Sequence, residues 1–128
     1  MIKIPYTTLR GRRLPLATLE IRGVIFTAYV DSGATYSVFH SGEAEIIGVD
    51  VEKGRWTTLT VGDGHEIPVY LHTLPVIFLD RKFEAIIGFT NKLRMGFNIL
   101  GRKDFFEKFT ICFNDSEAMI TAHEHGKF

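Results

Sequence analysis

The sequence contains a single cysteine, Cys112, so no disulfide can form within the chain. A lone cysteine fits a protein of a reducing compartment, where folding does not depend on disulfides. Cys112 lies in the apolar run 109–113, which predicts a buried thiol without a reactive role. Residues 1–6 lack the continuous apolar segment of a secretory signal peptide, so we expect a cytoplasmic protein.

Long apolar runs and an excess of one charge are also absent. No segment approaches the roughly 20 apolar residues that a membrane-spanning helix needs. The 15 Lys and Arg residues balance the 15 Asp and Glu residues, so nothing in the net charge favours nucleic acid or an acidic membrane. We therefore expect no nucleic acid and no membrane among the partners, while self-association is not opposed by charge.

Motifs for nucleotides and metals are missing as well. Gly62-Asp63-Gly64 lacks the third glycine and the following helix of a dinucleotide-binding fingerprint, and the chain has no phosphate-binding loop. The histidines are scattered. His123 and His125 flank Glu124 without the further ligands that zinc requires, so a solvated segment is favoured there. The sequence predicts no metal and no organic cofactor.

Strand patterns dominate what is present. A chain of 128 residues, 45% of them hydrophobic, has the size and composition of one domain with a packed core. We assign a single domain to residues 1–128, with a core at about 14–113 and a C-terminal strand extension at 114–128. Alternating or β-branched runs between turn residues mark the expected strands. These strands are 14–22, 24–30, 55–61, 66–72, 74–79, 83–87, 109–113 and 117–122.

Helix signals are few and short. Residues 41–47 predict a helix with Ser41 as its N-cap and Gly48 at its end. Residues 102–108 predict a second short helix. Many short strands with one or two short helices predict an all-β domain whose sheet closes into a barrel.

Asp31 is the candidate catalytic residue. It follows the strand 24–30 and enters a turn with Ser32 and Gly33. Hydrolysis of a peptide by water needs a base to activate the water and an acid to protonate the leaving nitrogen. Two carboxylates that share one proton perform both tasks and titrate as a coupled pair. The glycine lets backbone N–H groups approach the carboxylate.

The tripeptide Asp31-Ser32-Gly33 is common in turns, and by itself a purely structural turn is the favoured interpretation. Two other segments change this interpretation. A glycine-tipped hairpin follows at 62–64, and an apolar step that ends on a glycine follows at 99–101. The three segments together resemble the retropepsin-like aspartic proteases, which are single-domain relatives of the retroviral proteases. The resemblance covers roughly residues 14 to 113 in the same order.

Each segment has its counterpart in that family. Residues 31–35 look like the catalytic Asp-Ser/Thr-Gly-Ala motif, 62–64 fall at the flap, and 98–102 look like the hydrophobic-hydrophobic-Gly-Arg element. The resemblance implies that Asp31, Ser32 and Gly33 form the catalytic motif. It also implies a substrate-binding set, which consists of Ala34, Thr35, Gly62, Asp63, Gly64, Ile99, Leu100 and Gly101.

The resemblance further implies a closed pepsin-like β-barrel and a symmetric homodimer. Each subunit would supply one Asp31, and the two carboxylates would meet at the two-fold axis as the catalytic dyad of an aspartic endopeptidase. The Ser32 hydroxyl would form a hydrogen bond across the dimer, and the flaps would close over an extended peptide or protein substrate. Main-chain hydrogen bonds and a lid suit such a substrate on physical grounds.

The sequence departs from the retroviral pattern at three places. Ser32 replaces threonine, and Asp63 and His65 occupy a flap tip that is glycine-rich in the retroviral enzymes. The chain also extends past the expected C-terminal helix by residues 109–128. Because chain termini build much of the dimer interface in the family, this extension is expected to contribute there.

Other interpretations stay open. The first is a peptide-binding or dimerisation module with the same fold and little cleavage, and the second is a structural β-barrel within a larger complex. The basic cluster Arg10-Gly11-Arg12-Arg13 favours a solvated loop, with a role in an interface or in steering the substrate as the alternative.

Overall fold

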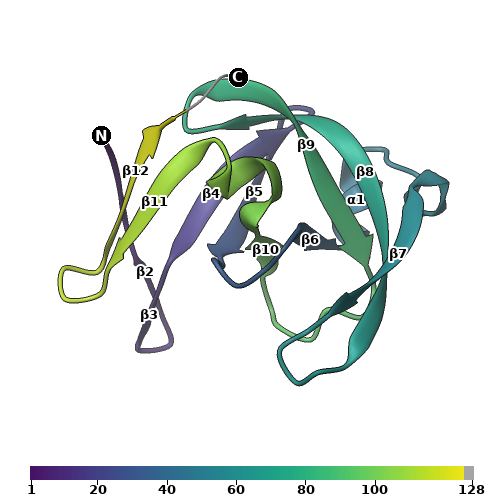
Figure 1. The fold of residues 1–128 in the computed structure, drawn as a ribbon, viewed down its shortest axis with the longest axis horizontal. Coiled ribbons are helices and arrows are strands. Elements are labelled where there is room, and N and C mark those ends of the chain that lie inside the picture. Colours follow the sequence, from purple (N-terminus) through teal and green to yellow (C-terminus); the bar gives the residue numbers. More distant parts are fainter. Residues whose placement is uncertain (126–128) are drawn as a thin grey trace.

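A computed structural model describes residues 1–125, and most of this part of the chain forms β-strands (Figure 1). The strands are β1 (Ile2–Pro5), β2 (Thr7–Leu9), β3 (Arg12–Leu14), β4 (Leu16–Ile21), β5 (Val24–Val30), β6 (Ser37–His40), β7 (Arg55–Thr60), β8 (Glu66–Phe78), β9 (Arg81–Thr90), β10 (Asn98–Leu100), β11 (Phe109–Asn114) and β12 (Met119–Glu124). The helical segments are α1 (Ser41–Ile46), η1 (Val51–Lys53) and η2 (Arg102–Phe106). This composition confirms the predicted all-β fold with few, short helices.

The main sheet closes on itself. Its seven strands follow the order β4-β5-β10-β6-β9-β8-β7, and β4 also pairs with β8. This additional pairing, which joins Ile21 to Val76, makes a ring of the first six strands and confirms the predicted closed sheet. The short strand β10 lies between β5 and β6, with Ile99 opposite both Tyr29 and Val38. Residues from the two halves of the chain therefore meet at the end of β5.

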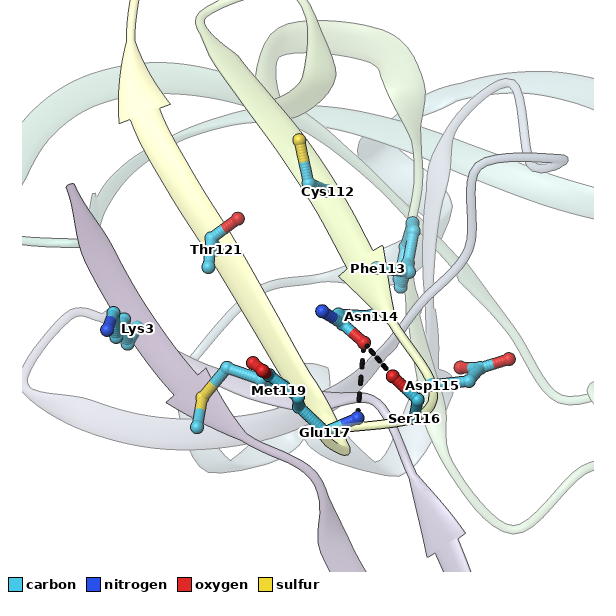
Figure 2. A pocket seen from close by; sticks show the side chains of 9 residues that line it. All are labelled: Lys3, Cys112, Phe113, Asn114, Asp115, Ser116, Glu117, Met119 and Thr121. Atoms are coloured by element: carbon cyan, nitrogen blue, oxygen red, sulfur yellow. Dashed lines mark hydrogen bonds between the residues drawn. The ribbon is translucent and has the colours of Figure 1, made fainter.

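A second sheet joins the two ends of the described chain. Its order is β1-β12-β11, so the N-terminal strand pairs with the last strand. Figure 2 shows one face of this sheet, where Cys112 lies opposite Thr121 and Lys3 lies on the far side of Thr121. Cys112 is exposed, so the prediction of a buried thiol is wrong. Residues 126–128 of the predicted C-terminal extension lie outside the described residues.

The strands expected at 66–72 and 74–79 form one element. Strand β8 runs through Thr73 without a break, because its ladder with β9 is continuous from Tyr70 to Phe78. The turn that follows is tighter than predicted and uses Leu79 and Asp80, both with positive φ. Strand β9 also continues to Thr90. The result is a long β8–β9 hairpin that spans the barrel (Figure 1).

The helix expected at 41–47 forms as α1, with one difference at its start. Its N-cap is His40 and not Ser41, and no side chain caps it. Gly48 follows the helix with a φ of +69°, as expected for a glycine at a helix end. This glycine turns the chain toward η1 and the β7–β8 hairpin.

The second predicted helix, 102–108, forms only in part, as the short helical segment η2. This segment is irregular, because Lys103 and Asp104 leave helical geometry and Asp104 has a φ of +69°. The Asp104 carboxylate accepts a hydrogen bond of 2.7 Å from the Ile86 N–H on β9. The start of this segment is therefore tied to neighbouring elements, while its end keeps a local turn in which the Lys108 N–H donates to the Phe105 carbonyl at 3.1 Å.

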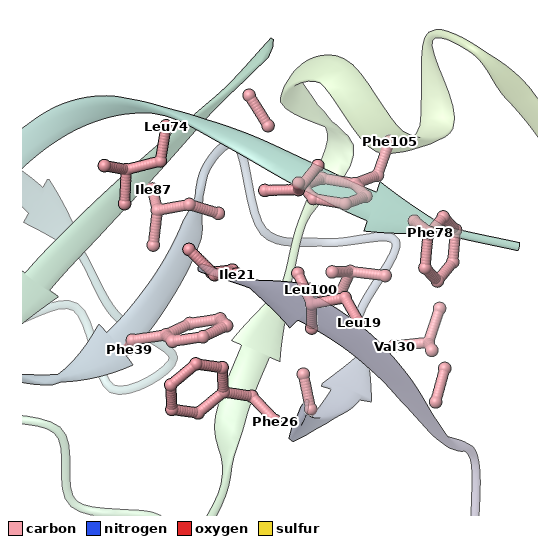
Figure 3. Close-up of a cluster of buried hydrophobic side chains, with 14 of the residues drawn as sticks. Leu19, Ile21, Phe26, Val30, Phe39, Leu74, Phe78, Ile87, Leu100 and Phe105 are labelled. Atoms are coloured by element: carbon pink, nitrogen blue, oxygen red, sulfur yellow. The ribbon is translucent and has the colours of Figure 1, made fainter. Parts of the chain in front are cut away.

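Seven of the 20 buried residues in the main core cluster are phenylalanines, and several of these rings meet edge to face. Phe39 contacts Phe26 and Phe89, with ring centroids 5.5 and 6.1 Å apart, and Phe78 contacts Phe105 at 5.3 Å. Figure 3 shows that this cluster also includes Val30 and Leu100. Val30 directly precedes Asp31, and Leu100 directly precedes Gly101. Because both side chains are packed in the core, the ends of β5 and β10 are held in fixed positions. Among residues 1–125, no helix is long and apolar enough to cross a membrane.

Candidate active site

Asp31 is held at the point where β5 ends beside β10. Its N–H donates to the Leu100 carbonyl at 2.9 Å, and the Val30 N–H donates to the Pro15 carbonyl at the same distance. Both Val30 and Leu100 are buried, so the start of the turn has little freedom. The side chain of Asp31 itself is only half-buried. A core-anchored backbone thus presents a carboxylate to solvent.

The turn after Asp31 is organised by its own carboxylate. One carboxylate oxygen, Oδ1, accepts the Gly33 N–H at 2.9 Å, and the Asp31 carbonyl accepts the Ala34 N–H at 3.2 Å. A Cβ atom at position 33 would lie 3.2 Å from Oδ1, which is tighter than most such contacts. The glycine therefore lets the backbone approach the carboxylate, as the sequence predicts. The second oxygen, Oδ2, has no hydrogen-bond partner among residues 1–125.

Gly101 supports this turn from the opposite side. Its N–H donates to the buried Ser37 hydroxyl at 2.9 Å. The next two N–H groups, of Arg102 and Lys103, donate to the carbonyls of Ala34 and Thr35 at 2.8 and 2.9 Å. Three consecutive N–H groups thus fix the loop that carries the predicted motif.

Close packing explains why position 101 is a glycine. A Cβ atom there would collide with the Tyr36 carbonyl and lie 2.9 Å from the Ala34 carbonyl oxygen. Both obstacles are backbone atoms, which cannot rotate away. Ser37, which the sequence did not single out, completes this support; no local signal distinguishes its hydroxyl from that of any strand serine.

The predicted substrate-binding residues of β10 have different surroundings. Ile99 is half-buried, whereas Leu100 is fully buried in the core. Leu100 therefore supports the Asp31 turn through its carbonyl and its packed side chain, which corrects the expectation that it faces a substrate. Gly101 is also buried and acts as the close-approach position described above.

The glycine-tipped hairpin is present as β7 and β8, and its tip contains two backbone hydrogen bonds. The Val61 N–H donates to the His65 carbonyl at 2.8 Å, and the Gly64 N–H donates to the Val61 carbonyl at 2.9 Å. Gly64 has a φ of +88°, which suits glycine. Gly62, Asp63 and Gly64 are all exposed. The predicted glycine-bearing turn is confirmed.

The side chains of His65 and Arg94 contact the Asp63 carboxylate at the tip of this hairpin. The Asp63 carboxylate accepts the His65 N–H at 3.0 Å and lies 2.9 Å from the His65 Nδ1. Arg94, in the loop between β9 and β10, places its Nη1 3.6 Å from the same carboxylate. Figure 1 shows the β7–β8 turn beside that loop. No hydrogen bond or ion pair within residues 1–125 joins the tip to the Asp31 turn.

The Asp63 contacts predict a measurable titration. The hydrogen bond from the His65 side chain, then that from its backbone, and then the charge of Arg94 hold the pKa of Asp63 below its ordinary 3.8. A lowered pKa means that the contacts stabilise the tip above pH 3.8 and are lost as the pH falls through the lowered value. NMR titration of the Asp63 carboxyl carbon should show this midpoint, and His65→Ala should raise it more than Arg94→Gln does. An equal midpoint in all three proteins would contradict the contact.

A hollow lies directly beside Asp31 and Ser32. Arg12 and Arg13 of β3 line it, although the sequence placed these residues in a solvated loop. Ser32 is exposed, and its hydroxyl has no hydrogen-bond partner within residues 1–125. The same described part of the chain contains no cluster of three His, Cys, Asp or Glu residues able to hold a metal ion. Asp31 and Asp115 are the two carboxylates that line this hollow, and Asp31 is the one in the predicted motif.

The closed sheet, the carboxylate turn at the end of β5 and the glycine step after β10 define the retropepsin-like fold. The chain is similar to the crystal structure of a retropepsin-like aspartic protease from Rickettsia conorii, with a TM-score of 0.71 and 18% identity over 94% of this chain and 98% of that one. It is also similar to EIAV protease complexed with the inhibitor HBY-793, with a TM-score of 0.57 and 17% identity over 75% and 88% of the two chains. No protein-family model and no curated protein matches the chain. At these identities the similarity establishes the fold.

Proposed function

We propose that the protein is an aspartic endopeptidase that acts as a homodimer. The observation that carries the proposal is the Asp31 turn: a half-buried carboxylate with one oxygen engaged by Gly33 and the other without a partner in the described chain. Both known structures reported above are proteases with the same fold, and the first is a retropepsin-like aspartic protease. A single chain offers one such carboxylate, so the proposed site needs Asp31 of the partner subunit.

The two carboxylates would share one proton and hold a water molecule between them. The ionised carboxylate removes a proton from the water, and the water oxygen bonds to the peptide carbonyl carbon at the same time. The protonated carboxyl group donates its proton to the carbonyl oxygen, which gives a neutral tetrahedral intermediate. When the carbon–nitrogen bond breaks, the carboxyl group that took the proton from water gives it to the leaving nitrogen. The other carboxylate takes a hydroxyl proton from the intermediate, so the second product is a carboxylic acid and the pair again holds one proton. No metal or organic group takes part in these steps.

The remaining residues would position the dyad and the peptide. We assign the Ser32 hydroxyl, which has no partner in the described chain, to a hydrogen bond across the dimer. Ala34 and Thr35 would contact the substrate on the side of the Asp31 turn, and the hairpin tips at Gly62 to Gly64 would close over its opposite side. An extended peptide between them is held by main-chain hydrogen bonds, and the closed hairpins exclude bulk water.

Cleavage and self-association measured on the same sample test this function. We expect the purified chain to sediment as a dimer at micromolar concentration and to cut an unfolded protein such as reduced, alkylated casein. Because one carboxylate must be ionised and the other protonated, kcat/KM should pass through a maximum with pH. A strictly monomeric chain, or a rate without an acidic limb, would contradict the shared-proton site.

A further inference from the structure

The hollow beside Asp31 has a volume of about 490 Å³. Side chains from three separate parts of the chain line it: Arg12 and Arg13 from β3, Tyr6 from the segment before β2, and Phe113 from β11. Asp31 and Ser32 form its edge toward the proposed catalytic water. A peptide bound across Asp31 would place one of its side chains at this hollow.

The arginines are carried by a hairpin with a fixed base. Strand β3 pairs with β2 through Thr7 and Leu14, and Leu14 is buried. Tyr6, at the start of this hairpin, donates its N–H to the Ala118 carbonyl at 2.8 Å and its hydroxyl to Asp115 at 2.7 Å. These two hydrogen bonds attach the base of the hairpin to the β11–β12 turn. The backbone of Arg12 and Arg13 is therefore held beside Asp31.

The acidic groups of this hollow have hydrogen-bond partners, whereas its two arginines have none among the described residues. Its two carboxylates have partners: Asp31 accepts the Gly33 N–H, and Asp115 accepts the Tyr6 hydroxyl. Burial, and then the hydrogen bond to Asp115, raise the pKa of Tyr6 to about 12, so this hydroxyl remains a donor. Arg12 and Arg13 form no ion pair and no side-chain hydrogen bond with any of residues 1–125. Two guanidinium groups therefore line the hollow without an anionic partner.

The residues that line the hollow indicate which kind of side chain would bind there. Phe113 and Leu14 offer apolar contact, while a guanidinium group presents paired N–H donors that match a carboxylate. A side chain with a short methylene stem and a terminal carboxylate satisfies both features. Glutamate in a peptide has this chemistry, and its neutral isostere glutamine lacks the charge.

We propose that the hollow is a specificity subsite in which Arg12 and Arg13 bind the carboxylate of a substrate glutamate close to the scissile bond. The proposal rests on the peptidase function above and adds the class of substrate: peptides with an acidic residue beside the cleaved bond. It also assigns a role to the basic cluster, for which a solvated loop is the expectation from sequence.

Matched peptides test the subsite. A series with Glu or Gln at each position that flanks the scissile bond should show one position where kcat/KM is at least about tenfold higher for Glu, since charged hydrogen bonds are strong. The Glu-to-Gln ratio should fall to about one in the double variant Arg12→Gln/Arg13→Gln. Arg10→Gln removes one positive charge at the tip of the same hairpin, outside the hollow, and should keep the wild-type ratio. A ratio within each protein does not depend on how much of it is folded.

The outcomes separate the two proposals. Cleavage with a Glu-to-Gln ratio near one at every position overturns the subsite and leaves the peptidase function standing. A double variant that stays dimeric and active and keeps the wild-type ratio also overturns it, because the arginines would then not bind the substrate glutamate. If no peptide is cut, the peptidase function fails, and fluorescence anisotropy decides the subsite: labelled Glu peptides should bind at least about tenfold more tightly than Gln peptides, and equal binding overturns it.

Discussion

Asp31→Asn is expected to abolish peptide cleavage while the protein stays folded and dimeric. Asparagine has the shape of aspartate, and its Oδ1 can still accept the Gly33 N–H that organises the turn. It cannot exchange a proton with water or with the substrate, and a symmetric dimer loses both carboxylates at once. General acid–base catalysis contributes about 10²–10⁴ in rate, so kcat should fall at least about 10³-fold.

The control for this change is Asp80→Asn. Asp80 lies in the β8–β9 turn with a φ of +65°, a conformation that asparagine tolerates well, and it is far along the chain from the proposed site. Its variant should keep wild-type kcat. Thermal unfolding and sedimentation of both variants establish that fold and dimer are preserved. Wild-type cleavage by Asp31→Asn, after removal of contaminating proteases, would end the aspartic protease interpretation.

Gly101→Ala is expected to destabilise the fold strongly. The added Cβ would collide with the Tyr36 carbonyl, and it would lie 2.9 Å from that of Ala34. Relief requires movement of a backbone that three consecutive hydrogen bonds hold in place. Overpacking of this kind costs about 1–3 kcal/mol and sometimes more, and we expect the upper end here. Urea unfolding monitored by circular dichroism measures the loss.

A matched glycine shows whether the methyl or its position matters. Gly42 lies in α1, and a Cβ atom there would meet nothing within 4 Å. Gly42→Ala should be neutral or stabilising by up to about 1 kcal/mol, because alanine is the better helix former. If both variants unfold at the same urea concentration as wild type, the close contact described for Gly101 is not present in solution.

The elements that the sequence predicted well are those with strong local signals. The hairpin between β4 and β5 turns at Arg22 and Gly23, both with positive φ, where the glycine predicts a turn. The β7–β8 hairpin follows from its glycine-bearing tip. Asp31 and Gly33 were also assigned correctly to one turn. They are two positions apart in the sequence, so their hydrogen bond depends only on the local backbone conformation.

The predictions that failed in part or in full depend on partners far away in the sequence. Residues 102–108 have helical composition but form only the irregular segment η2, in which the Arg102 and Lys103 N–H groups bind the loop at 34–35 and the Asp104 carboxylate binds strand β9. Cys112 lies in an apolar run, yet β11 turns this position to the outside of a small sheet that has only three strands. A single-sequence pattern reports local preference and average burial, and tertiary contacts override both.

The sequence by itself determined the all-β class, the position of the carboxylate turn at Asp31 and the glycine step at Gly101. Each of these depends on backbone conformation within a few residues. The tertiary structure alone decided what surrounds Asp31. Ser37 binds Gly101 across 64 positions of sequence, and Tyr6 binds Asp115 across 109, which brings Arg12 and Arg13 beside the site. Such partners are selected by the pairing of distant strands, β6 with β10 in the main sheet and β1 with β12 in the second, because only that pairing brings these segments within hydrogen-bonding distance.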